Sequence, residues 1–167
     1  MNIVGVKEIR AKLAVDMKEF AHPVIRVTKE FVFEMAHALD GYDGLCRNIH
    51  GHSYKLSVTV KGRASTDEGS PKLGMVIDFS VLKRIVGEEI VGRLDHALMV
   101  RRGSRLESMA AGVTERVEVV EYQPTCENMV ADFARRVARR LPEGLELVSV
   151  RLHETGTSFA EWVASDN

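Results

Sequence analysis

Three histidines in one short segment have the types and spacing of metal ligands. His50 and His52 flank Gly51 at the start of a predicted strand, and side chains two apart on a strand point to the same side. His37 follows the preceding predicted strand and reaches the same point if the two strands pair as an antiparallel hairpin. Three neutral imidazoles with a fourth position open are typical of catalytic zinc. We therefore predict a Zn²⁺ site here; the alternative is ordinary polar residues near a turn.

Cys46 lies four residues before His50, on the glycine-containing loop between the two predicted strands. A thiol there would sit near the metal without ligating it, and a nearby cation favours the reactive thiolate. The loop thus predicts a nucleophilic or proton-carrying Cys46. It also allows a closed structural site of one cysteine and three histidines. A third alternative, an inert buried thiol, suits so polar a loop less well.

Further polar residues lie at the ends of predicted elements. Asp95 and His96 end a predicted helix. They could form a general acid/base pair, or His96 could simply interact with the dipole at the helix C-terminus. Glu154 follows an apolar strand, where a carboxylate can accept two parallel hydrogen bonds from an amidine-like ring edge, or be solvated. Thr125 is a good helix N-cap and Glu127 suits the first helical turn.

The elements that must position these residues follow from hydrophobic periodicity. Strands are expected at residues 24–33, 54–61, 116–122, 145–153 and 158–164, helices at 78–94 and from 125 to 141, and exposed loops at 62–74 and 99–115. This order lacks the strict alternation of a parallel βαβ sheet. It predicts an α+β domain, with an antiparallel sheet and two helices on one face.

The composition is that of a soluble globular domain. The chain has 167 residues, of which 45% are apolar and 28% charged, and a net charge of −1 gives no basic field for nucleic acid. The arginines at 135, 136, 139 and 140 are expected on a solvated helix face. Two distant cysteines, no signal peptide and no apolar stretch long enough for a membrane predict a reducing cytoplasm. Residues 1–24 form either a short amphipathic helix or a loose leader.

Taken together, the motifs resemble one family. They occur in the order seen in the 6-pyruvoyltetrahydropterin synthase/6-carboxytetrahydropterin synthase family, and the match spans about residues 26 to 164. The ordered set is more specific than any single motif. The motifs are Phe33-Glu34-Met35-Ala36-His37, Cys46-x-x-x-His50-Gly51-His52, Gly74-Met75-Val76-Ile77-Asp78-Phe79, Leu94-Asp95-His96, Pro124-Thr125-Cys126-Glu127-Asn128 and His153-Glu154-Thr155.

The resemblance implies a tunnelling (T-fold) domain over residues 25–167, preceded by an N-terminal extension, 1–24. Such a domain has a four-stranded antiparallel sheet with two helices on one face, both between the second and third strands, so the 116–122 strand would be an extra element. Members form trimers and hexamers with active sites between subunits. The implied roles are zinc on His37, His50 and His52, a catalytic thiol on Cys46 with partners Asp95 and His96, pterin anchoring on Glu154, and substrate binding by Thr125 and Glu127.

The short gap between Cys46 and His50 resembles the bacterial 6-carboxytetrahydropterin synthase branch of queuosine biosynthesis. That branch implies conversion of 7,8-dihydroneopterin triphosphate to 6-carboxy-5,6,7,8-tetrahydropterin, with loss of acetaldehyde and triphosphate. Alternatives are a 6-pyruvoyl product, a three-histidine zinc hydrolase and a non-catalytic zinc-stabilised binding module. The chain departs from the family pattern in its leader, in the segment 100–119, and at Cys126 and His153. Candidate cations for the triphosphate are Arg47, Lys55, Lys72 and Arg101.

Overall fold

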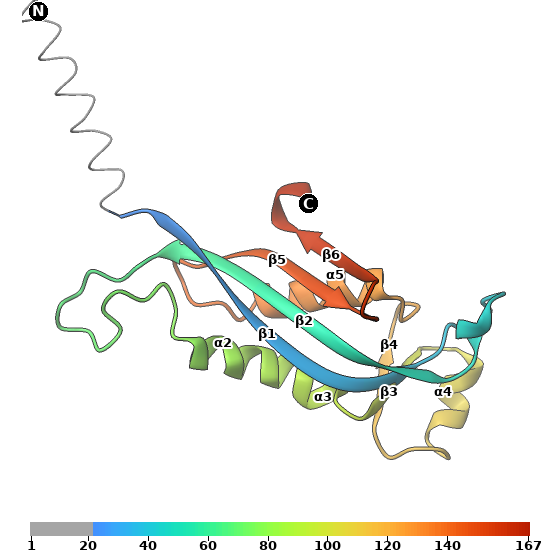
Figure 1. Cartoon of the computed structure of the whole chain (residues 1–167). Coiled ribbons are helices and arrows are strands. Elements are labelled where there is room, and N and C mark those ends of the chain that lie inside the picture. The colour runs from blue at the N-terminus through green and yellow to red at the C-terminus, as the bar shows by residue number, and fades with distance from the viewer. Residues whose placement is uncertain (1–21) are drawn as a thin grey trace, which may run out of the picture.

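A long, curved hairpin organises the fold in residues 22–167, the part of the chain that the computed structural model describes (Figure 1). Strand β1 (Val24–His37) pairs antiparallel with β2 (His50–Arg63) over the full length of both, from Val24 opposite Arg63 to His37 opposite His50. Both strands are longer than the periodicity predicted. Their extra residues place His37, His50 and His52 within the β1–β2 ladder. Residues 1–21, most of the expected extension, lie outside the described part.

Two further strands complete the antiparallel set. β5 (Glu146–His153) pairs with β2, and β6 (Phe159–Val163) pairs with β5, both antiparallel and close to the expected bounds. The predicted α+β class and the four antiparallel strands are therefore confirmed. The sheet is larger than predicted, however, because it has six strands in the order β4-β3-β1-β2-β5-β6.

One of the two additional strands, at residues 117–120, confirms the strand predicted at 116–122, and it is part of the sheet. The segment 99–115 was expected to be an exposed loop, and that expectation is wrong, because it contains the end of another strand and a helix. β3 (Ala97–Arg101) pairs parallel with the end of β1, and β4 (Val117–Val120) pairs parallel with β3. Between them, helix α4 (Arg105–Ala110) packs onto the strands through Leu106. β3 has four consecutive buried residues, which is the pattern of a strand covered on both faces rather than an alternating one.

Two helical segments cover one face of the sheet (Figure 1). The first begins after the N-cap Asp78 and runs through α2 (Phe79–Val86), the π-helical turn η2 (Gly87–Val91) and α3 (Gly92–Leu94). The second is α5 (Cys126–Ala138). Both lie between β2 and β5 in the chain, as the resemblance implied. Short 3-10 turns, η1 (Leu45–Arg47) and η3 (Ala164–Asp166), complete the described elements.

The main core lies between this face and the helices. Alternate residues of β1 and β2 are buried against it, among them Phe33, Tyr54 and Leu56, and the helices contribute residues such as Phe133. The opposite sheet face is polar and open, with cross-strand pairs such as Lys55 with Glu30. This alternation fixes which residues share a face, because a shift of one residue would turn every side chain over.

The sequence predicted that the arginines of α5 lie on a solvated helix face. For Arg136 this prediction is wrong. The side chain of Arg136 is 15% exposed and contacts two buried carboxylates, Asp132 (Nη2–Oδ2 2.7 Å) and Glu118 of β4 (Nη2–Oε1 3.3 Å). It also donates to the backbone oxygen of Glu89 in η2. One side chain thus joins α5, β4 and η2, which ties the additional strands to the helical layer.

Replacement of Arg136 by alanine should therefore destabilise the fold. The change leaves Asp132 and Glu118 buried with fewer partners, and we expect a loss of about 3 kcal/mol in the free energy of unfolding, the lower end for a broken buried ion pair, because Arg135 and Arg93 remain beside them. Denaturant unfolding measures the loss. The matched control is Arg139→Ala, an exposed arginine at the end of the same helix, which should change stability by less than about 0.5 kcal/mol. Equal stabilities for the two variants would contradict a structural role for Arg136.

Candidate metal centre and active site

His37, His50 and His52 converge at one end of the hairpin. His37 lies directly opposite His50 in the β1–β2 ladder, and His52 follows two residues later on the same face, diagonal to His37. One ligand atom from each lies within 4.8 Å of the other two, and these three residues are the group in the described part that could hold a metal ion. The ligand geometry predicted from the sequence is therefore present in the structure.

Backbone carbonyls orient two of the three rings. The Nδ1–H of His37 donates to the carbonyl oxygen of Pro124 (2.7 Å), and the Nδ1–H of His50 donates to that of Asn48 (2.8 Å). Since a carbonyl can only accept, the protons are on Nδ1 and each Nε2 is free to bind a metal. Burial lowers the pKa of both His37 and His52, which favours the neutral form that coordination requires. The residues thus fit a three-histidine zinc site with an open fourth position.

Glu154 and Tyr54 stand beside the metal group. Oε1 of Glu154 lies 3.5 Å from Nε2 of His37, and the Tyr54 hydroxyl donates to the same Oε1 at 3.4 Å. The hydroxyl also lies 3.4 Å from His37 Nε2. Burial, reinforced by the charge of Glu154, raises the pKa of Tyr54 far above its usual value, so it remains a neutral donor. The Glu154 carboxylate is therefore held at the metal group with its other oxygen available.

Tyr54 was not among the residues singled out from the sequence. Its signal is present, because Tyr54 follows His52 by two positions and thus shares its side of β2. The period of two was interpreted only as the mark of a half-buried strand. Tyr54 is fully buried and stacks on Phe33, so it is both part of the core and part of the site.

Cys46 is partly exposed on η1, with its thiol free. Its carbonyl oxygen accepts a hydrogen bond from the backbone of Leu39 (2.9 Å), two residues beyond His37, so the cysteine turn folds back onto the end of β1. Its sulfur is not among the ligand atoms that converge within 4.8 Å. The structure thus favours an open three-histidine site with a separate thiol over a closed site of four ligands.

Asp95 and His96 form a pair beside β1, at the edge that pairs with β3 rather than with β2. Oδ1 of Asp95 accepts the backbone N–H of Glu34 (3.0 Å) and lies 3.1 Å from His96 Nδ1. The hydrogen bond from Glu34, together with that from His96, lowers the pKa of Asp95, so it is ionised at neutral pH. His96 has φ +59° and a side chain that is 74% exposed. A non-glycine residue in this sparsely populated region is held there by its surroundings, a feature that clusters at functional sites.

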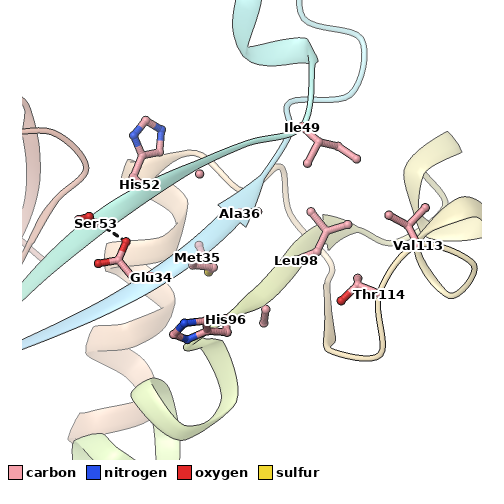
Figure 2. A pocket seen from close by; sticks show the side chains of 12 residues that line it. Glu34, Met35, Ala36, Ile49, His52, Ser53, His96, Leu98, Val113 and Thr114 are labelled. Atoms are coloured by element: carbon pink, nitrogen blue, oxygen red, sulfur yellow. Dashed lines mark hydrogen bonds between the residues drawn. The ribbon is translucent and has the colours of Figure 1, made fainter.

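A hollow of about 450 Å³ opens beside this pair (Figure 2). Its lining includes Glu34, which accepts a hydrogen bond from Ser53 (2.8 Å), and both His52 and His96. Figure 2 shows His52 and His96 pointing apart, with β1 and β2 between them. Within one chain the rings of His52 and His96 thus point away from each other, although both residues line this hollow.

The start of α5 borders the metal centre through Pro124, which holds His37. Thr125 is the N-cap of this helix and accepts the backbone N–H of Asn128, while Glu127 is exposed in the first turn. Both residues thus have the capping roles that the sequence allowed, and their implied contact with substrate stays a prediction. Cys126 is buried, and burial raises the pKa of its thiol to about 11, so it is not a second reactive cysteine.

Comparison with known proteins decides the family. A model described as 6-pyruvoyl tetrahydropterin synthase matches residues 26–164. The chain belongs to this 6-pyruvoyl tetrahydropterin synthase family. Within it, the chain is 39% identical over 141 residues to the 6-carboxy-5,6,7,8-tetrahydropterin synthase of Haemophilus influenzae, an alignment that covers 83% of this chain and 99% of the relative. It is 27% identical over 142 residues to the enzyme of the same description from Rickettsia bellii, with the same coverage.

Two solved structures share the fold. The Caenorhabditis elegans 6-pyruvoyl tetrahydropterin synthase superposes with a TM-score of 0.62 at 22% identity, covering 85% of this chain and 96% of that one. An uncharacterized protein from Wolinella succinogenes gives 0.66 at 22% identity, covering 85% and 99%. The expected T-fold is thus confirmed. Among the described residues, no helix has the length and apolar character to cross a membrane.

Proposed function

We propose that this chain is a zinc-dependent 6-carboxy-5,6,7,8-tetrahydropterin synthase, a lyase that converts 7,8-dihydroneopterin triphosphate with release of acetaldehyde and triphosphate. The observation that carries the proposal is the placement of Glu154 within 3.5 Å of His37 in a three-histidine group. A ring-binding carboxylate and a metal are thereby set side by side, as a pterin with a hydroxylated side chain requires. The alignment with the Haemophilus influenzae enzyme over nearly its whole length supports this product. The pathway would be queuosine biosynthesis, and the two free cysteines suit the cytoplasm.

The residues of the chain divide the work. Glu154 accepts the N3–H and 2-amino hydrogens of the pterin and fixes the ring, so that the side chain reaches His37, His50 and His52 in one orientation. Zinc bound there supplies Lewis-acid polarisation of the side-chain hydroxyls. The thiolate of Cys46 moves protons between carbon and oxygen, and Thr125 and Glu127 border the ring at the start of α5.

The Asp95–His96 pair completes the chemistry from a neighbouring subunit. Within one chain the ring of His96 points away from that of His52 (Figure 2), and Asp95 is bonded to the backbone of Glu34 in β1. Its exposure leaves His96 free to reach a site on another copy, where it acts as a general acid and base with its imidazole oriented by Asp95. The functional unit in this proposal is a homo-oligomer, a trimer or hexamer, with sites between subunits.

Tyr54→Phe should weaken pterin binding and leave the metal in place. The change removes the hydroxyl that donates to Glu154 and keeps the buried ring. We expect a rise in KM of roughly 10-fold, the worth of one hydrogen bond to a charged group, with the zinc content unchanged. Tyr122→Phe is the control, because it removes a partly buried hydroxyl that donates to Asp132 rather than to Glu154, and it should alter stability alone. An unchanged KM in Tyr54→Phe would show that the hydroxyl does not position Glu154.

Mass spectrometry of the products, after incubation of the zinc-loaded protein with 7,8-dihydroneopterin triphosphate, tests the function. A 6-carboxytetrahydropterin peak together with acetaldehyde is expected. A 6-pyruvoyl product would keep the site and replace the proposed reaction. Absence of turnover, with hydrolysis of unrelated esters or phosphates by the Cys46→Ala protein, would favour a zinc hydrolase. Unfolding on metal removal with no pterin binding would indicate a zinc-stabilised binding module.

A further inference from the structure

A second hollow, of about 370 Å³, lies beyond the end of β1. Its lining comes from the loop after His37, at Asp40, Gly41 and Tyr42, from Arg47 of η1, and from Arg105 at the start of α4. Figure 1 shows the 38–49 loop and α4 at the same end of the sheet. Two segments distant in the sequence, the 38–49 loop and the start of α4, thus contribute to one cavity, and two of its five lining residues are arginines.

The charges of this hollow are not balanced. Its carboxylate, Asp40, already lies 3.9 Å from Arg101. Arg47 and Arg105 are exposed, and neither has a carboxylate within 4.0 Å in the described part of the chain. The other cations considered from the sequence are paired, Lys55 with Glu30 and Lys72 with Asp78. Two free guanidinium groups facing one cavity favour a ligand that carries several negative charges.

The hollow is close to the metal centre. Asp40 follows His37 by three residues, which limits the distance between their backbones to about 11 Å. Both ends of this short segment are held by adjacent residues before α5, because Gln123 donates to the carbonyl oxygen of Asp40 (2.9 Å) and the carbonyl of Pro124 holds His37. Arg47 adjoins Cys46.

Position along the hairpin gives an order. Glu154 contacts Tyr54 and His37, the metal group extends to His50 at the end of the ladder, and the hollow begins past it. The substrate of the proposed reaction has the same order of parts: a pterin ring, a hydroxylated side chain and a terminal triphosphate. With the ring on Glu154 and the hydroxyls at the histidines, the triphosphate extends toward Arg47 and Arg105.

We propose that Arg47 and Arg105 form the binding site for the triphosphate group of the substrate, and that Arg101 belongs to its rim, held by Asp40. The identity of the triphosphate as part of a pterin substrate rests on the proposed function. The cavity and its two unpaired guanidinium groups do not. Arg105 could not be found from the sequence, because it lies in the segment expected to be an exposed loop.

Binding of inorganic tripolyphosphate to the full-length, zinc-loaded protein tests the site, by calorimetry at one fixed salt concentration. Arg47→Ala and Arg105→Ala should each weaken binding by about 10-fold or more, and the double variant should weaken it further. The lysine variants should retain part of the affinity, since they keep the charge and lose the two-pronged contact. Arg139→Ala, which removes an exposed arginine at the end of α5, should bind as the unchanged protein does. Zinc content and unfolding temperature verify that each variant is folded.

Three results separate the two proposals. Weaker tripolyphosphate binding together with a matching rise in KM for 7,8-dihydroneopterin triphosphate supports both. Weaker tripolyphosphate binding in a protein that gives no pterin product keeps the polyphosphate site and overturns the proposed function. Unchanged binding in both arginine variants, or equal weakening in Arg139→Ala, overturns the site whatever the enzyme does, because the effect is then absent or reflects overall charge.

Discussion

His52→Ala should lose its zinc and its turnover while the protein remains folded. Two imidazoles cannot hold the metal as three do, and we expect bound zinc to fall from one per chain toward none and turnover to drop by roughly 10³-fold or more. His52 is the most informative ligand to remove. Its side chain is partly exposed and makes no hydrogen bond within the described part, whereas His37 is buried and bonded to Pro124. Elemental analysis of the purified variant, with its unfolding temperature, gives the result.

His22→Ala is the matched control for this change. His22 precedes β1 at the far end of the hairpin from the metal group and is exposed, so its loss should change neither zinc content nor turnover. A His52→Ala protein that still carries one zinc per chain would contradict the three-histidine site. Zinc loss from both variants would point to a general effect of histidine number on metal recovery.

The metal centre could be predicted from the sequence because it depends on local regularity. A strand has a period of two, so His50 and His52 must share a face, and a hairpin must return His37 to the same end. Neither inference needs a knowledge of side-chain packing. The helix cap at Thr125 was predictable for the same reason, since capping is decided within a few residues.

Features that depend on contacts between distant segments were not predictable in this way. The segment 99–115 has no clear hydrophobic periodicity. Its strand and helix are stabilised because Val100 and Leu106 pack with Leu98 in one hydrophobic cluster beside β1. From the sequence Arg136 resembles a surface residue, because its contact with Glu118 of β4 depends on the tertiary structure. The sequence does not distinguish Arg105 from the other arginines, because only the position of α4 in the fold brings it to the same hollow as Arg47. In each case the sequence contains the residue but not its neighbour.

The separation of Cys46 from His96 is a finding of another kind. Sequence motifs placed both residues in one catalytic set, and the resemblance implied sites between subunits. In a single chain the thiol lies on the η1 turn, and the imidazole follows α3 and is bonded through Asp95 to Glu34 of β1. In one chain the His96 ring points away from that of His52 (Figure 2), which is the arrangement that the proposed site between two copies requires.

Cys46→Ala should abolish turnover while the zinc content stays at one per chain. The thiol is free, partly exposed and outside the group of metal ligands, so its removal takes away a proton-transferring group and no ligand. The loss should be roughly 10³-fold, within the range for a positioned acid or base. Cys126→Ala is the control, since that thiol is buried and protonated. Loss of zinc from Cys46→Ala would support the closed four-ligand site, and an active Cys46→Ala enzyme would support a hydrolase that needs no thiol.

The same variant also tests whether the site is shared. Cys46→Ala and His96→Ala should each be inactive alone, but co-produced in one cell they form mixed oligomers. If Cys46 of one subunit works with His96 of another, about a quarter of the sites in a random mixture have both residues intact, and activity returns to that level. If both residues acted from one chain, every site would lack one of them and no activity would return. Recovery therefore decides between a site within one subunit and a site between two. Recovery is expected because His96 is exposed and its ring points away from that of His52 in one chain (Figure 2).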